Sequence, residues 1–153
     1  MATKGRGMTE TLETDYLVDA IRIGQSIQSS YDAVIEQLNQ LDVSCLPYVE
    51  VTNRDVNKNL AAYSCVYFLV DKGKYEYVVK YVGKTTNLHN RWNYPRRSLF
   101  GQPHACFERC VSWLERYGRA IRIAWIPIER QFLAATEMFL IDRFDPPWNV
   151  HKA

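Results

Sequence analysis

This sequence lacks the features that are typical of membrane proteins, disulfide-rich proteins and zinc-binding proteins. No apolar segment of the signal-peptide type opens the chain, and no apolar run reaches the length of a membrane span. Only four cysteines occur, and the spacing of Cys106 and Cys110, without a second ligand pair, does not fit a zinc site. We therefore expect reduced cysteines and a soluble, intracellular (cytoplasmic) protein without a membrane partner.

Repeats and low-complexity tracts are also absent, and the composition is that of an ordinary globular protein. The 153 residues are 47% hydrophobic and 24% charged, which is enough to bury a sizeable core. The charge is divided unevenly, because residues 1–60 carry nine acids and five bases whereas residues 61–153 carry eight acids and fourteen bases. This division favours a polyanionic partner for the second part of the chain, although a difference of this size also occurs without one.

Hydrophobic periodicity predicts an α+β fold in the second part of the chain. The expected order is β-β-α-α-β-α, a small three-stranded antiparallel sheet flanked by helices. The elements are strands over residues 65–70 and 77–83, a short helix capped by Thr85 or Thr86, a helix over about 107–117 ended by Gly118, a strand over 121–126 and a helix over about 129–144.

An N-terminal helical segment precedes these elements. Apolar residues recur at helical spacing from Leu17 to Leu41, which indicates one long helix or two helices broken near residues 24–30. Residues 47–51 are typical of a short strand. The helical segment either packs on its own domain or provides the interface of a homodimer.

The last predicted helix carries one acidic residue within its apolar stripe. The stripe consists of Leu133, Leu140, Ile141 and Phe144, and Glu137 falls near its middle. Burying an unpaired carboxylate is costly, so Glu137 should bind a metal, pair with a cation, be protonated, or reach solvent at the end of the stripe. A structural ion pair is the ordinary alternative to a functional role.

The strand pair makes a prediction about two tyrosines. Side chains alternate across a strand, so a two-residue turn would place Tyr67 and Tyr81 on opposite faces, whereas a loop of three or five residues would place them together. A shared site for the two phenols therefore requires a loop with an odd number of residues. Tyrosine is also a common strand residue, and the chain has ten.

Six short segments resemble, in order, the motifs of the GIY-YIG nuclease superfamily over about residues 63–150. One departure is Cys65 in place of the first glycine of the motif. The resemblance divides the chain into an N-terminal helical arm and linker, residues 1–62, and a GIY-YIG-like nuclease domain, residues 63–153. The matching segments are Val66-Tyr67-Phe68, Tyr81-Val82-Gly83-Lys84-Thr85, Asn87-Leu88, Arg91, Glu137 and Pro147-Trp148-Asn149.

The resemblance implies a metal-dependent DNA endonuclease that hydrolyses a phosphodiester at a single-metal site. Glu137 would bind Mg²⁺ or Mn²⁺, and the Arg91 guanidinium would bind phosphate oxygens. Asn149 would orient the phosphate or the glutamate through hydrogen bonds. DNA is then the expected partner.

The same resemblance gives catalytic roles to the tyrosines. Tyr67 would accept a proton from the attacking water, alone or relayed by Tyr81. An unperturbed tyrosine has a pKa near ~10, so Lys84, Arg91 or a metal would have to favour the phenolate. Lys84 would serve this purpose or contact a phosphate, and Gly83 would let a bound partner approach the backbone.

A histidine or tyrosine of the family falls about one turn beyond the arginine, where this chain has Pro95. We assign that role to His104, and Tyr94 and His89 are the alternatives. His104 could equally serve only to cap the following helix. In the loop over residues 93–103, Arg96 and Arg97 are the expected DNA contacts.

Two other functions fit the same pattern. The chain could be a catalytically inactive nucleic-acid-binding module of this fold, or a protein-interaction module that works through its acidic helical arm. The inactive module should have lost Glu137 or Arg91, and both are present. The interaction module predicts no salt-dependent binding to DNA.

Overall fold

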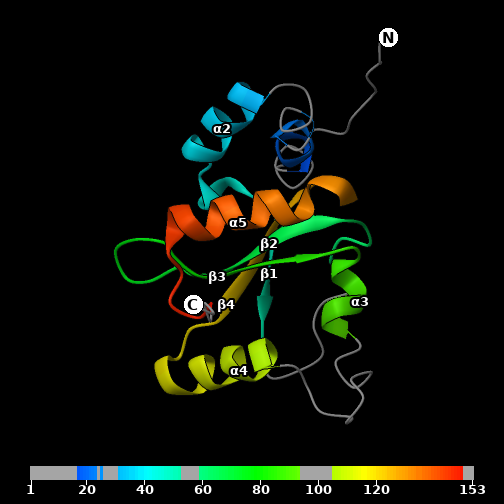
Figure 1. Ribbon diagram of the computed structural model, residues 1–153. Helices are drawn as coiled ribbons and strands as arrows, with labels where there is room; N and C mark the ends of the chain where they lie inside the picture. The colour runs from blue at the N-terminus through cyan, green and yellow to red at the C-terminus, as the bar shows by residue number, and fades with distance from the viewer. Residues whose placement is uncertain (1–16, 24, 26–30, 53–58, 94–104, 150–153) are drawn as a thin grey trace.

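A computed structural model describes residues 17–23, 25, 31–52, 59–93 and 105–149 (Figure 1). Residues 17–23 are helical, and α2 follows after residues that lie outside the described ranges. The other elements are α2 (Tyr31–Gln40), η1 (Val43–Cys45), β1 (Tyr48–Val51), β2 (Cys65–Asp71), β3 (Val78–Thr85), α3 (Leu88–Asn93), α4 (Ala105–Tyr117), β4 (Ile121–Pro127), η3 (Arg130–Phe132) and α5 (Leu133–Phe144).

The fold is α+β with one antiparallel sheet, as predicted, but the sheet has four strands rather than three. The strand order is β1-β4-β2-β3, and the additional strand is β1, which pairs with β4 at one edge. Residues 47–51 were expected to form a strand, but their sequence gave no sign of the distant partner. β3 forms the opposite edge.

The helices occur where apolar spacing predicts them, with two differences at their starts. Gly118 has φ +72° and ends α4, as expected for a left-handed residue after a helix. The short helix α3 is capped by Asn87 rather than by a threonine, since its side-chain oxygen accepts a hydrogen bond from the Asn90 N–H at 3.0 Å. The last helix starts with the 3₁₀ turn η3 and becomes α-helical at Leu133.

Helices cover both faces of the sheet (Figure 1). The side chains of β2 are buried throughout, so they alternate between two cores. One core lies against α5, and Phe68 and Leu140 belong to it. The other lies against α3 and α4, and it contains Tyr67 and Trp92.

The N-terminal helical segment contributes to the first of these cores. Ala20, Leu38 and Leu41 are buried there, and α2 packs against α5. The packing of this segment on its own domain is therefore one of its uses, and homodimerisation through it stays a prediction. No helix in the described part of the chain is long and apolar enough to cross a membrane.

The loop between β2 and β3 differs from the expectation, although the two tyrosines do share a face. Asp71 pairs with Val78, which leaves a loop of six residues, an even number. A β-bulge then leaves Lys80 without a partner in β2, and Leu69 pairs with Tyr81. The extra residue reverses the alternation, so Tyr67, two residues from Leu69, lies on the same face as Tyr81.

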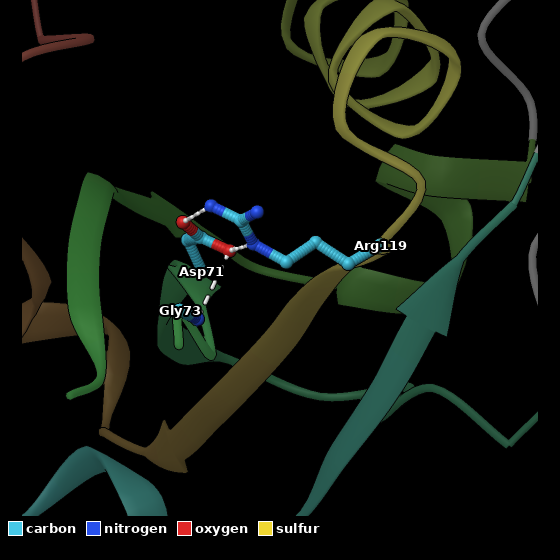
Figure 2. Close-up of polar contacts among 3 residues, drawn as sticks. All are labelled: Asp71, Gly73 and Arg119. Atoms are coloured by element: carbon cyan, nitrogen blue, oxygen red, sulfur yellow. Dashed lines mark hydrogen bonds and ion pairs between the residues drawn. The ribbon is translucent and has the colours of Figure 1, made fainter. Parts of the chain in front are cut away.

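An ion pair holds the loop end of β2 to the segment after α4 (Figure 2). The Arg119 Nε and Nη2 atoms donate to the two carboxylate oxygens of Asp71 at 2.8 and 2.9 Å, and the Gly73 N–H donates to the same carboxylate at 3.2 Å. Asp71 is buried, whereas 42% of the Arg119 side chain is exposed. The hydrogen bond and charge of Arg119 hold the pKa of Asp71 below its ordinary value, despite burial.

Candidate functional site

Gly83 allows the two tyrosine rings to lie over β3. A Cβ atom at this position would be 2.6 Å from Cζ of Tyr67, 2.7 Å from its hydroxyl oxygen and 2.8 Å from Cε2 of Tyr81. The space beside the glycine is therefore filled by the chain's own phenols. The close approach that Gly83 permits here is internal, and its contact with a bound partner stays a prediction.

Tyr67 lies at the centre of the site and is almost completely buried, with 1% exposure. Its ring is 6.1 Å from the ring of Tyr81 and 6.2 Å from that of Trp92, and its hydroxyl is hydrogen-bonded to Arg91. Burial raises the pKa of Tyr67 well above its ordinary value, Tyr81 adds to the rise, and Arg91 opposes it by less. The electrostatics of the protein alone thus favour the phenol, which leaves a metal as the expected source of charge that could favour the phenolate.

Tyr81 is only half-buried, and it is the more accessible of the two phenols. Burial raises its pKa, and contact with Cys106 and the charge of Glu137 raise it further, whereas Arg91 lowers it. Arg91 therefore acts on both phenols, and the carboxylate of Glu137 is close enough to affect the second.

Helix α3 presents Arg91 through two buried anchors. Leu88 and Trp92, four residues apart, are 0% and 1% exposed, whereas Arg91 lies between them on the exposed side. The N–H of His89 also fixes the helix by donating to the Ala61 carbonyl at 2.8 Å. The burial of Trp92 in the core thus fixes the position of the neighbouring Arg91 and its guanidinium.

Glu137 of α5 forms an ion pair with Lys84 of β3, and not with a distant arginine. The Lys84 Nζ atom lies 3.2 Å from Oε1 of Glu137, and the side chains are 45% and 17% exposed. Glu137 is half-buried beside Thr136, which is the buried polar residue of this helix. Lys84 follows Gly83 directly, so alternation along β3 turns its side chain to the α5 face, opposite the phenols. The charge of Glu137 nevertheless reaches Tyr81 at this edge strand.

The Asn149 side chain binds the free edge of β3. Its amide nitrogen donates to the Val82 carbonyl, and its amide oxygen accepts from the Val82 N–H, both at 2.9 Å. The neighbouring Trp148 N–H donates to the carbonyl of the bulge residue Lys80 at 2.8 Å. The Asn149 amide thus pairs with the backbone of the edge strand β3 in the way that a neighbouring strand would. Its described contacts do not include the predicted one with Glu137.

Four predicted positions lie outside the described residues. They are His104, its alternative Tyr94, and the expected DNA contacts Arg96 and Arg97. The other alternative, His89, is on α3.

Cys106 belongs to the site and was missed from the sequence. It contacts the Tyr81 hydroxyl from the first turn of α4. Burial raises the pKa of its thiol, whereas Tyr81, Arg91 and Arg109 lower it. Their spacing in the sequence indicates that Cys106 and Cys110 lie on the same face of a helix. That this face contacts Tyr81 depends on how α4 packs against the sheet, which the sequence does not reveal.

Neither a protein-family model nor a curated protein matches the chain. Among solved structures, the chain is similar to the GIY-YIG N-terminal endonuclease domain of UvrC from Thermotoga maritima, in two tyrosine-to-phenylalanine point mutants bound to the catalytic divalent cation. The identities are 21% and 20%, and both alignments have a TM-score of 0.44 and cover 61% of this chain and 90% of the other. This is the family that the sequence motifs resemble. A similarity of this degree assigns no function, which has to be argued from the residues of the site.

Proposed function

We propose that the protein is a divalent-metal-dependent endonuclease that hydrolyses phosphodiester bonds in DNA. The observation that carries the proposal is the grouping of Tyr67, Tyr81 and Arg91 at the edge strand that also holds Lys84, whose partner Glu137 acts on Tyr81 through its charge. In this set, the guanidinium of Arg91 can bind phosphate oxygens, the tyrosine hydroxyl groups can transfer protons and the carboxylate of Glu137 can bind a hard cation.

The donor set fits one hydrated Mg²⁺ or Mn²⁺ ion at Glu137. Mg²⁺ retains several water molecules and is commonly bound through one or two carboxylates, so a full protein cage is not needed. Within the described residues no three acidic, histidine or cysteine side chains are grouped as metal ligands. Lys84 is the cation beside Glu137, and its exposure lets it turn into solvent or toward a phosphate. When bound, the metal would neutralise charge on the phosphoryl and leaving oxygens.

Arg91 would bind the phosphate group that is to be cleaved. One of its donors contacts Tyr67, and a guanidinium has five N–H groups, so others can bind phosphate oxygens. A positioned positive charge lowers the barrier most where negative charge accumulates in the transition state.

Proton transfer would proceed through Tyr81, with Tyr67 behind it. Tyr67 is too deeply buried to contact water directly, whereas Tyr81 is half-buried on the same face. Both phenols hold their protons in the free protein because burial raises their pKa values. The positive charge of the bound metal would therefore have to favour the phenolate before the attack, with the phenol proton released to solvent, so that the phenolate can accept the proton of the attacking water.

The test is nicking of supercoiled plasmid DNA with Mg²⁺ or Mn²⁺. We expect Glu137→Gln to abolish nicking, because it removes the charge that would bind the metal, whereas Glu129→Gln, at an exposed glutamate that makes no capping hydrogen bond, should nick normally. Equal nicking by wild type and Glu137→Gln, or nicking unaffected by chelation of the metal, would refute the proposal. Metal-independent DNA binding without nicking would instead identify an inactive binding module.

Homodimerisation through the N-terminal helical arm, residues 1–62, is a separate proposal. A one-site nuclease needs two copies to cut both strands at once. Of the apolar residues in this arm, Leu17 and Ile21 remain 36% and 40% exposed. Light scattering should give a dimer mass for the wild type and a monomer mass for Leu17→Lys/Ile21→Lys, and a monomer in both cases would exclude the idea.

A further inference from the structure

A groove beside α4 is not used by the site described above. It has a volume of about 460 Å³ and is open to solvent on one side. We propose that this groove binds an unpaired DNA segment that flanks the cleaved phosphodiester. The proposal rests on the nuclease function proposed above and adds the structural class of its substrate. The groove is lined by Glu108, Arg109, Trp113, Arg116, Tyr117 and Trp148, among others.

Charge favours a nucleic-acid strand as the occupant. Arg109 and Arg116 are both exposed and lie seven residues apart, so they project from the same side of α4. Their separation along the helix axis is about 10 Å, so the two guanidinium groups can contact different phosphates of one strand. Glu108 is the acidic member of the lining, and Lys80 adds a positive charge with its Nζ atom 4.4 Å from the ring centre of Trp113.

Aromatic rings favour unpaired bases over a duplex. The Tyr117 ring is 44% exposed and lies 4.3 Å from the ring of Trp113, which in turn lies 5.6 Å from that of Trp148. The Arg109 guanidinium is 5.8 Å from the ring centre of Trp148. Rings next to arginines bind single strands because bases stack on them, whereas bases inside a duplex are already stacked on each other.

Two of the groove's lining residues lie close to residues of the site. Cys106, which contacts Tyr81, is one helical turn before Arg109 on α4. At the other side, Trp148 is hydrogen-bonded to the carbonyl of Lys80, directly before Tyr81 in β3. A strand leaving the phenols would therefore enter the groove within a few nucleotides.

The proposal is tested by binding in the presence of a chelator, so that no DNA is cut. Fluorescence anisotropy would compare a fork with a single-stranded flank and a blunt duplex of the same length. We expect the wild type to bind the fork at least tenfold more tightly. Arg109→Ala/Arg116→Ala should lose at least tenfold of this affinity, and the slope of log K against log salt should fall by about 1.4 for two phosphate contacts on a single strand. Arg130→Ala, an exposed arginine on η3, is the matched control and should behave as the wild type.

A second variant separates stacking from charge. Tyr117→Leu keeps every charge and should reduce the preference for the fork, with little change in affinity for the blunt duplex. Equal wild-type affinities for fork and duplex, or unchanged fork binding by the double arginine variant, would overturn the proposal. Because metal and nicking take no part, loss of the fork preference would not touch the nuclease proposal. Conversely, absence of nicking with fork binding intact would refute the nuclease proposal and leave the groove as a binding site for unpaired DNA, without the cleaved bond beside it.

Discussion

The two faces of the sheet differ in chemistry although the same strands build them. The face against α5 is closed by aliphatic and phenylalanine side chains such as Val66, Phe68 and Leu140. The face against α3 and α4 is just as buried around Tyr67, but it contains hydroxyl, indole and thiol groups and opens toward Arg91. A single strand, β2, supplies alternate residues to both. Along β2, stability and the tyrosine chemistry are thus assigned to opposite sides, whereas the Lys84–Glu137 pair lies on the α5 side at the edge of the sheet. Substitutions in β2 should separate the two properties.

The largest effect on stability is expected on the α5 face. Phe68 is fully buried and its ring lies 5.9 Å from that of Phe144, so Phe68→Ala should lower the free energy of unfolding by about 3–5 kcal/mol. Urea unfolding measures this loss. Because Phe68 points away from Tyr67, the nicking rate per folded molecule should stay within about twofold of the wild type. If the nicking rate per folded molecule fell by much more than twofold, the two faces would be coupled.

The converse change is Arg91→Ala on the other face. It removes the proposed phosphate-binding charge, and we expect nicking to fall by about 100–1,000-fold, the range found when one transition-state donor is lost. The free energy of unfolding should fall by only about 1–3 kcal/mol, because the buried Tyr67 hydroxyl loses its hydrogen bond while Leu88 and Trp92 still hold the helix. Plasmid nicking and urea unfolding on the same preparations test both statements. Unchanged nicking would remove Arg91 from the mechanism.

Gly83→Ala should damage both properties at once. The added methyl group would lie 2.6–2.8 Å from atoms of both tyrosines, so the rings or the strand must shift. We expect a loss of about 1–3 kcal/mol in stability from overpacking, together with a loss of nicking.

Gly118→Ala is the matched control for Gly83→Ala. Gly118 has φ +72°, which strains any other residue, but a Cβ atom there would meet nothing within 4 Å. It should therefore cost stability without changing the nicking rate per folded molecule. Equal nicking by Gly83→Ala and wild type would show that the tyrosine geometry is not critical.

Local sequence pattern predicts most of the secondary structure but not the contacts that join its elements. The strands, the α4 helix and its end at Gly118 follow from spacing and from glycine chemistry. The positions of Tyr67 and Tyr81 on one face were predicted for an odd loop, and they arise from an even loop and a bulge at Lys80. No local signal reveals such a bulge, because the carbonyl of the bulge residue Lys80 accepts its hydrogen bond from the N–H of Trp148, far along the chain.

The candidate site shows the same limit. Glu137 stood out because a carboxylate within an apolar stripe needs a partner, and the partner is Lys84 of the tyrosine-containing strand. Asn149 stood out only through the family motif, and its bonds to the edge of β3 could not be foreseen without the strand order. The raised pKa of Tyr67 also depends on burial, which the charges of its neighbours in the sequence do not reveal.

The smallest predicted effect concerns the ion pair at the loop end of β2, which takes no part in the proposed site. Asp71→Asn should cost about 1–2 kcal/mol at neutral pH, since it weakens hydrogen bonds to a charged group whose partner, Arg119, is partly screened by water. The folded state lowers the pKa of Asp71, so the stabilisation is present above the unfolded-state pKa of about 3.9 and is lost as pH falls through the lower folded-state value. Urea unfolding of both proteins between pH 7 and pH 3 should therefore give a constant difference down to about pH 4, which then shrinks. A difference that grows on acidification would mean that Asp71 does not carry its negative charge in the folded protein.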